Sequence, residues 1–227
     1  MKGRPLSGYN GLVARYYPIA LDLRNRLCVV IGGGSVAERK VRTLREYEAQ
    51  VLVIAPRVSS QVREWAREGV IRLEEREYRH GDLSGAFLAM GATDDPRVNE
   101  AVFLEAQELG LLVNIADDPA HCNFIVPATL RRGDLNIAIT TGGKSPALAR
   151  QLRQELEELY PPEYAKHLED LARYRGHLRE RLPDTGLREA TWRELMAKGL
   201  LDLLRDNRTQ EAWDLVRQAA AQAGETK

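Results

Sequence analysis

The chain has few of the residues that mark secreted or metal-binding proteins, and no charge excess. Its two cysteines, Cys28 and Cys122, are too few and too far apart in 227 residues for a disulfide framework or a zinc knuckle. The 33 basic and 33 acidic residues balance, so no overall field attracts nucleic acid or an anionic membrane. No apolar run approaches the roughly 18 residues of a membrane span, and residues 1–15 lack the apolar segment of a signal peptide. We expect a cytoplasmic protein that binds neither nucleic acid nor membrane, with Cys28 in its core.

Short apolar runs alternate with amphipathic segments over the first half of the chain. The apolar runs are typical of strands buried in a parallel sheet, and they cover residues 27–31, 51–55, 70–73, 87–93 and 111–116. Helical patterns follow the first, second and fourth of these runs. Strands that alternate with helices at this pitch form βαβ units. The sequence therefore predicts an α/β fold with a Rossmann-like, doubly wound parallel sheet.

The pattern changes after residue 116. Two strand-like runs, residues 124–130 and 135–141, flank a Gly-Asp pair that suits a hairpin. Ser145-Pro146 then predicts a helix start, because Ser is a good N-cap and Pro is tolerated at the first helical position. The rest of the chain predicts three helices, at residues 163–181, 188–205 and 208–223. We therefore predict a Rossmann domain (1–116), a small α+β segment (117–160) and a C-terminal helical domain (161–227).

A glycine-rich turn joins the first predicted strand to its helix. It has the spacing G-x-G-x-x-A, in Gly32-Gly33-Gly34-Ser35-Val36-Ala37. The first glycine permits a tight turn, Gly34 lets the backbone approach a pyrophosphate, and Ala37 keeps the helix close to the strand. The helix N-terminus offers N–H groups to the anion. The alternative is a glycine-rich turn that binds no ligand.

The second predicted strand lacks the acidic residue that usually binds the adenine ribose. It ends in Ala55-Pro56-Arg57. Backbone groups near Pro56 could hold the ribose of NAD, or Arg57 could meet the 2′-phosphate of NADP. The loop alone does not decide whether the cofactor is NAD or NADP.

Polar residues follow two further predicted strands, at the edge of the sheet where ligands collect. Thr93 is a candidate contact for the cofactor, and Asn99 is a candidate for the same region. Asp94 and Asp95 are equally explained as caps of the next helix. Asp117, which precedes a second Asp and a Pro, is either a catalytic carboxylate or part of a turn.

A second glycine loop leads into the helix predicted from residue 145. Basic residues lie near this loop in the sequence, and a helix N-terminus attracts anions. We predict contacts with a carboxylate-rich substrate at Thr141, Gly142, Gly143, Lys144, Ser145, Arg131 and Arg150. The alternative is a capped helix with a solvated basic end. No His/Cys cluster has the spacing of metal ligands, so we predict no metal site.

Six motifs occur in an order that resembles a known family. They are Gly32-Gly33-Gly34-x-Val36-Ala37-x-Arg39-Lys40, Ile54-Ala55-Pro56, Ala92-Thr93-Asp94-Asp95, Asn114-Ile115-Ala116-Asp117, Asn123-Phe124-Ile125-Val126-Pro127-Ala128 and Thr141-Gly142-Gly143-Lys144-Ser145-Pro146-Ala147-Leu148-Ala149. Together they look like the precorrin-2 dehydrogenase/sirohydrochlorin ferrochelatase family, which includes the N-terminal module of siroheme synthase. The resemblance covers about residues 16–160.

The resemblance implies NAD-dependent oxidation of precorrin-2 to sirohydrochlorin, and in some members insertion of Fe2+ into the product to give siroheme. It also implies a homodimer built around the segment after Asp117. By the resemblance, Ser35, Val36, Pro56 and Arg57 lie along the NAD. With the residues already proposed from the motifs, cofactor contacts are expected at Gly32, Gly33, Gly34, Ser35, Val36, Ala37, Pro56, Arg57, Thr93 and Asn99. Asp117 matches the aspartate held to be essential to both reactions. A carboxylate can act as a base when burial favours its protonated form. Thr141 stands where some relatives have a serine that can be phosphorylated.

Two other functions fit part of the pattern. A chelatase that inserts Fe2+ or Co2+ would keep the glycine loop as a relic. A nucleotide-sensing module would bind the cofactor alone, but such modules usually have an acidic residue after the second strand and have no reason for the second glycine loop. His121 is either a neighbour of Asp117 or an incidental loop histidine.

Overall fold

The computed structural model describes residues 16–225. Residues 1–15, where we expect no signal peptide, lie outside the described part. The chain forms two units: one runs to residue 126 and includes residues 142–144, and the other contains residues 127–141 and the chain from residue 145 on. The division into three segments at residues 116 and 160 stays a prediction.

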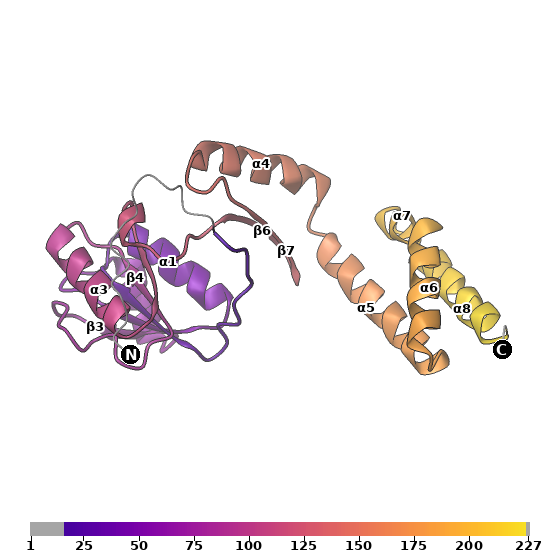
Figure 1. The fold of residues 1–227 in the computed structure, drawn as a ribbon, viewed down its shortest axis with the longest axis horizontal. Coiled ribbons are helices and arrows are strands. Elements are labelled where there is room, and N and C mark those ends of the chain that lie inside the picture. The colour runs from indigo at the N-terminus through magenta and orange to yellow at the C-terminus, as the bar shows by residue number, and fades with distance from the viewer. Residues whose placement is uncertain (1–15, 226–227) are drawn as a thin grey trace, which may run out of the picture. The chain divides into compact units, whose positions relative to one another are not determined.

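The first unit is built on a five-stranded parallel sheet (Figure 1). The strand order is β3-β2-β1-β4-β5, so the order reverses between β1 and β4. The carboxyl ends of such strands meet at one edge, where ligands bind in this class of fold. The predicted doubly wound sheet is confirmed. Its strands are β1 (Leu27–Ile31), β2 (Gln50–Ile54), β3 (Arg72–Glu74), β4 (Leu88–Gly91) and β5 (Leu112–Ile115).

Helices cover both faces of this sheet because successive residues of each strand point to opposite sides. In β1, Cys28 and Val30 enter the core under α1 (Ser35–Glu46) and α2 (Ser60–Arg67). Val29 and Ile31 enter the core under α3 (Pro96–Glu108). All four residues are buried, and burying one Val or Ile side chain contributes about 1.5–3 kcal/mol. Cys28 is a core residue, as predicted.

The second unit begins with an antiparallel hairpin of β6 (Ala128–Arg132) and β7 (Leu135–Ile139). Arg132 pairs with Leu135, so Gly133 and Asp134 form the predicted two-residue connection. The first strand starts at Ala128, later than expected, because Pro127 has no N–H for the ladder. The helix predicted from Pro146 is present as α4 (Pro146–Leu159) and packs on the hairpin.

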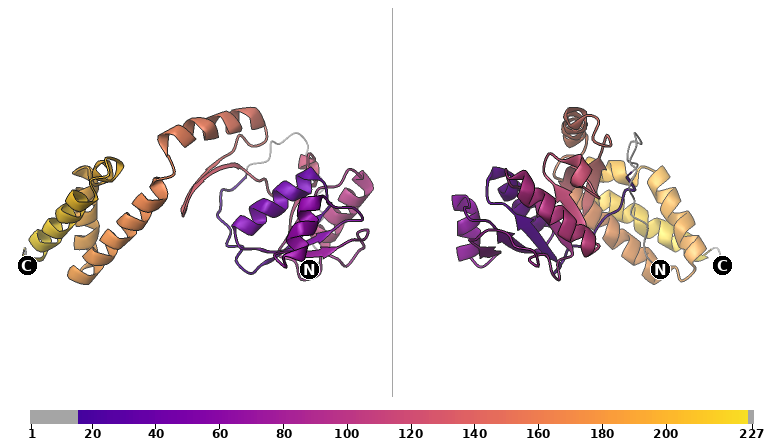
Figure 2. Two further views of the ribbon diagram at one scale, coloured as in Figure 1. Left: turned by 180° about the vertical axis from the view of Figure 1, so that it is seen from behind. Right: turned by 60° about the vertical axis from the view of Figure 1, so that its left-hand side comes forward.

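Four helices follow and share one apolar core. Figure 2 shows these helices, coloured orange to yellow, gathered toward the C-terminus. They are α5 (Tyr164–Arg181), α6 (Thr185–Ala197), α7 (Leu200–Arg205) and α8 (Thr209–Glu225). The prediction of three helices is wrong, because the expected helix 188–205 is broken at Gly199. Gly199 has φ +81°, a left-handed conformation that a continuous right-handed helix does not contain. Within residues 16–225, none of the helices is long and apolar enough to cross a bilayer.

Candidate functional site

Gly32 and Gly33 occupy positions where no side chain fits. Gly32 has φ +123°, and a Cβ there would lie 2.2 Å from the carbonyl oxygen of Ala92. A Cβ on Gly33 would lie 2.2 Å from the carbonyl oxygen of Arg57. The glycine loop is therefore held closely between the chain segments that follow β4 and β2.

Gly34 is a different kind of position. It is the N-cap of α1, with φ −83°, and a Cβ there would meet no atom within 4 Å. No side chain caps the helix, so the N–H groups of its first turn remain available to an anion that the helix dipole also favours. Glu38, the acidic residue of this turn, is paired with Arg42 and accepts a hydrogen bond from the Ser59 hydroxyl. The loop therefore fits the pyrophosphate of a dinucleotide.

The segment after β2 lies against the glycine loop. The backbone N–H of Ser59 donates to the carbonyl oxygen of Gly33 at 2.8 Å. Pro56 and Arg57, both exposed, lie in the same segment. The structure therefore brings together the two groups of residues that the sequence assigned to the cofactor.

Thr93 and Asn99 also lie together, beside the glycine loop. The backbone nitrogen of Thr93 would be 3.2 Å from a Cβ on Gly32. The side-chain amide of Asn99 donates to the carbonyl oxygen of Thr93 at 3.0 Å. Asp95 accepts from the backbone N–H of Arg97 at 2.9 Å and caps α3, so the capping interpretation of Asp95 is confirmed. Cofactor contacts of Thr93 and Asn99 stay a prediction.

Asp117 lies in the turn that follows β5. The turn starts at the same edge of the sheet as the glycine loop, since Ile115 pairs with Gly91 and Gly91 pairs with Ile31. Asp117 has φ +58°, which Asp tolerates better than most residues do. Its side chain is exposed. Within the described structure, the residues around Asp117 therefore do not bury its carboxylate, although burial would favour the action of a carboxylate as a base.

His121 pairs with the next aspartate rather than with Asp117. Its Nδ1 lies 2.6 Å from Oδ2 of Asp118, and its ring packs edge-on against Phe103 with centroids 4.7 Å apart. The hydrogen bond with His121 lowers the pKa of Asp118. This pair fixes the short 3-10 helix η1 (Pro119–His121) after the turn.

A polar network to which the sequence motifs assigned no role lies under the turn that carries Asp117. Nζ of Lys40, on α1, donates to Oδ1 of Asn114, on β5, at 2.7 Å. The side chain of Asn114 in turn donates to the carbonyl oxygen of Phe124 at 3.1 Å. The sequence contained one signal for this network: Lys40 lies three residues after the buried Ala37 and four before the buried Leu44, on the same face of the helix. A lysine on the buried face of an amphipathic helix is unusual.

The second glycine loop is ordered by its own side chains. The Thr141 hydroxyl accepts from the backbone N–H of Ser145 at 2.9 Å. Ser145 caps α4 by accepting from Leu148 N–H at 3.2 Å, as predicted. Gly142 and Gly143 have φ values of +62° and +82°, which favour glycine.

Three basic candidates for substrate binding are exposed. Lys144 belongs to the second glycine loop, Arg131 to β6 and Arg150 to α4. The guanidinium of Arg131 donates to the carbonyl oxygen of Gly133 at 3.2 Å, and that of Arg150 to Pro146 at 3.4 Å. Their contacts with substrate stay a prediction.

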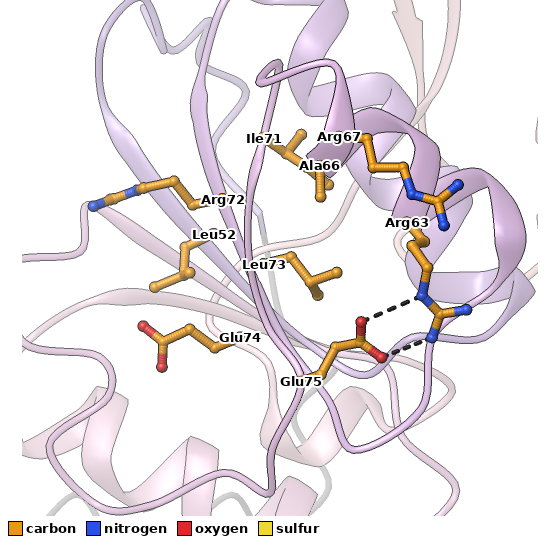
Figure 3. Close-up of a pocket in the computed structure, with 9 residues that line it drawn as sticks. All are labelled: Leu52, Arg63, Ala66, Arg67, Ile71, Arg72, Leu73, Glu74 and Glu75. Carbon is orange, nitrogen blue, oxygen red and sulfur yellow. Dashed lines mark hydrogen bonds and ion pairs between the residues drawn. The ribbon is translucent and has the colours of Figure 1, made fainter.

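A hollow of about 800 Å3 lies elsewhere, between α2 and the edge strand β3 (Figure 3). Ile71 and Leu73 line it, and Arg63 pairs with Glu75 at 2.7 Å beside it. The hollow contains no residue of the glycine loop or of the Asp117 turn. It therefore has no connection with the candidate site.

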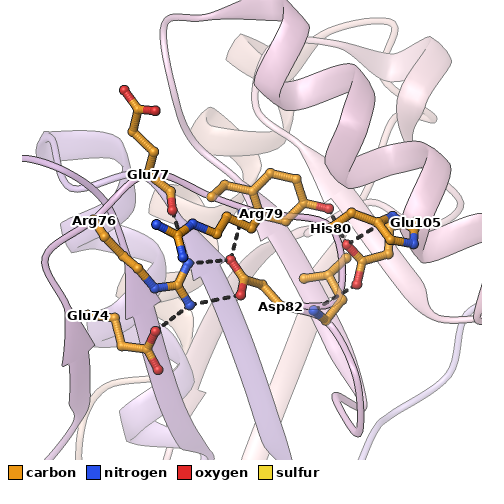
Figure 4. Close-up of polar contacts among 9 residues, drawn as sticks. Glu74, Arg76, Glu77, Arg79, His80, Asp82 and Glu105 are labelled. Carbon is orange, nitrogen blue, oxygen red and sulfur yellow. Dashed lines mark hydrogen bonds and ion pairs between the residues drawn. The ribbon is translucent and has the colours of Figure 1, made fainter.

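A second polar network has a structural role (Figure 4). Glu105 is only 2% exposed, and it accepts hydrogen bonds from the backbone N–H of Leu83 at 2.9 Å and from the Tyr78 hydroxyl. Arg76 pairs with Asp82 at 2.7 Å in the same segment. These contacts hold the loop between β3 and β4 and attach it to α3. Among residues 16–225, no three His, Cys, Asp or Glu side chains are grouped to hold a metal ion.

The fold and the glycine loop define a Rossmann-type protein that binds a nicotinamide dinucleotide. A family model described as putative NAD(P)-binding matches residues 19–128. A second, described as sirohaem biosynthesis protein central, matches residues 132–159.

Relatives and a solved structure agree with these two matches. Siroheme synthase of Nitrosococcus oceani is 37% identical over 198 residues, which are 87% of this chain and 42% of the relative. Siroheme synthase of Edwardsiella ictaluri is 38% identical over 190 residues, which are 82% and 40% of the two chains. The structure of SirC, a precorrin-2 dehydrogenase, is 29% identical with a TM-score of 0.73, and the match covers 89% of this chain and 100% of that one.

These matches confirm the resemblance of this chain to the precorrin-2 dehydrogenase family, which includes a module of siroheme synthase. The chain spans about two fifths of the length of the siroheme synthases that it matches.

Proposed function

We propose that this chain is an NAD-dependent precorrin-2 dehydrogenase of siroheme biosynthesis, which forms sirohydrochlorin. The observation that carries the proposal is the match to a precorrin-2 dehydrogenase over the whole length of that structure. The glycine loop supports it, because Gly34 and the uncapped end of α1 suit a pyrophosphate.

In this proposal the sheet edge holds the cofactor. The first turn of α1 binds the pyrophosphate, Pro56 and Arg57 lie along the adenosine end, and Thr93 with Asn99 lies toward the nicotinamide. Bound NAD supplies a hydride acceptor. We assign NAD rather than NADP from the family resemblance, and titration with both cofactors tests the assignment. Binding of NADP+ at least tenfold tighter than NAD+ would contradict it.

Asp117 is proposed as the base of the reaction. Oxidation of precorrin-2 removes a hydride, which goes to the nicotinamide, and a proton, which Asp117 accepts. The exposed carboxylate at the sheet edge can reach a substrate that lies there. A bound macrocycle would exclude water from the carboxylate and favour proton transfer.

The carboxylates of the substrate are proposed to meet the second glycine loop. The N-terminus of α4 and the cations Lys144, Arg131 and Arg150 would attract an anion. The chain has no net charge, so this local cluster of positive charge would be what attracts the anionic substrate.

We also propose a homodimer, and α4 supports it. Leu148, Leu152 and Leu159 recur along one side of this helix and are 46%, 37% and 66% exposed, while the buried Ala149 lies on another side. A second copy would cover this apolar stripe. Sedimentation of the wild-type chain should show a dimer, and Leu152→Glu should shift it to monomer. The control Leu109→Glu, at an exposed leucine after α3, should remain a dimer. A monomeric wild-type chain would contradict this part of the proposal.

The proposed activity is tested by the absorbance change when precorrin-2 is mixed with NAD+. We expect the wild-type chain to form sirohydrochlorin. Asp117→Asn should bind NAD+ with unchanged affinity but lose turnover by about 100-fold or more, within the usual range for a general base. The matched control Asp134→Asn, at an exposed hairpin turn, should have the wild-type rate. A wild-type chain that leaves precorrin-2 unchanged would overturn the proposal.

The same preparation separates the alternatives. Sirohydrochlorin with Fe2+ and without NAD+ reports chelation alone, and metal insertion without oxidation would identify a chelatase. Binding of NAD+ with neither conversion would identify a nucleotide-sensing module. We place the reaction in the cytoplasm, because Cys28 and Cys122 are both free thiols and need no oxidising compartment.

A further inference from the structure

Lys40 is a charged residue on a helix face that packs against the sheet. The same face of α1 buries Ala37, Val41 and Leu44. Moving an ammonium group out of water costs free energy unless it finds partners. Burial lowers the pKa of Lys40, while the negative charge of Asp117 acts in the opposite direction. The hydrogen-bond partner of Lys40 is the side-chain oxygen Oδ1 of Asn114, which accepts from Nζ at 2.7 Å.

Asn114 and Cys122 form the base of the turn that carries Asp117. The side-chain nitrogen of Asn114 contacts Sγ of Cys122 at 3.5 Å and donates to the carbonyl oxygen of Phe124 at 3.1 Å. Sγ of Cys122 also accepts from the backbone N–H of Ile115 at 3.2 Å. These bonds join the residues before the turn to the residues after it. All of them are local, whereas the bond from Lys40 spans 74 positions of the sequence.

The electrostatic setting of Asp117 differs from that of its neighbour. Asp118 is paired with His121 at 2.6 Å. Asp117 and Lys40 attract each other through charge, and Arg39, also on α1, opposes the charge of Lys40. The strained φ of +58° at Asp117 persists only when the surrounding contacts hold the turn.

We propose that Lys40 is a positioning residue for the carboxylate of Asp117, because it anchors, through its bond to Asn114, the turn that carries this carboxylate. This inference deepens the proposed dehydrogenase function and rests on it. If Lys40 had a purely structural role, it would only join α1 to β5, and its loss would have no effect specific to turnover.

The test compares Lys40→Met, Lys40→Arg and the control Lys198→Met. Met has a similar length but neither charge nor donor, while Arg keeps both. Lys198 is an exposed lysine in a surface pair with Glu194, where loss of the charge has little effect. For each chain, kcat and KM for precorrin-2, Kd for NAD+ and amide hydrogen exchange of residues 112–124 are measured.

We expect Lys40→Met to lower kcat by about 10- to 100-fold, the usual effect of a small displacement of a catalytic group. Its KM for precorrin-2 and Kd for NAD+ should stay within about twofold of wild type, and exchange in residues 112–124 should accelerate about tenfold. Lys40→Arg should restore most of kcat, and Lys198→Met should match wild type in every measurement.

Two results separate the inference from the function on which it rests. A wild-type chain without precorrin-2 oxidation overturns the proposed function. Unchanged kcat in Lys40→Met overturns the inference, as do equal changes in kcat and in NAD+ affinity. If the wild-type chain is inactive, unchanged hydrogen exchange in Lys40→Met overturns the anchoring of the turn by itself.

Discussion

Gly34→Ala should separate cofactor binding from folding. A Cβ at Gly34 meets no protein atom within 4 Å, and φ −83° is accessible to Ala. Replacing Gly by Ala at a compatible position stabilises by about 0.4–1 kcal/mol through the unfolded chain. Ala is a poorer N-cap than Gly, by an amount of the same order. The two effects offset each other, so the free energy of unfolding should change by less than about 1 kcal/mol.

Binding of NAD+ should respond differently in this variant. The new methyl group would occupy the space through which a pyrophosphate approaches the backbone. We expect Kd for NAD+ to rise at least tenfold, which corresponds to about 1.4 kcal/mol. Urea unfolding and calorimetric titration with NAD+ measure the two quantities.

Gly33→Ala is the matched comparison. Its Cβ would lie 2.2 Å from the carbonyl oxygen of Arg57 and 2.7 Å from Cγ1 of Val58. Such overpacking costs about 1–3 kcal/mol, so this variant should lose both stability and NAD+ affinity. Wild-type affinity in Gly34→Ala would refute the assignment of the loop as the pyrophosphate site.

Further predictions concern the core of the first unit. Glu105→Leu should lower the free energy of unfolding by about 2–3 kcal/mol, because Leu83 N–H and the Tyr78 hydroxyl lose their buried acceptor; unchanged urea unfolding would count against this role. Burial raises the pKa of Cys28 to about 11 and also raises the pKa of Cys122. Both thiols therefore stay protonated near neutral pH, and the thiolate needed for alkylation forms only as pH rises toward these pKa values. Maleimide at neutral pH should label Cys28 only after unfolding and Cys122 slowly, and rapid labelling of the native chain would contradict the structure.

The sequence predicted the glycine loop between β1 and α1 because its determinants are local. Gly32, Gly34 and Ala37 lie within six residues between a buried strand and a helix, and the physics of a pyrophosphate cradle needs little else. The doubly wound sheet was predictable for a similar reason, since buried parallel strands leave continuous apolar runs.

Features that depend on distant or subtle contacts were not predicted. The bond between Lys40 and Asn114 joins residues 74 positions apart, and the sequence alone does not specify which strand end a helix faces. The helix break at Gly199 was missed because apolar periodicity continues on both sides of it, although a glycine is itself a stop signal. The exposure of Asp117 depends on how the turn after β5 is directed, which the local sequence does not specify.

The most direct test of the account follows NADH and sirohydrochlorin together while the wild-type chain acts on precorrin-2. Hydride transfer to the cofactor predicts one NADH for each sirohydrochlorin formed, and no pigment conversion above the spontaneous rate when NAD+ is omitted. Pigment formation without NADH, or at the same rate without NAD+, would contradict it.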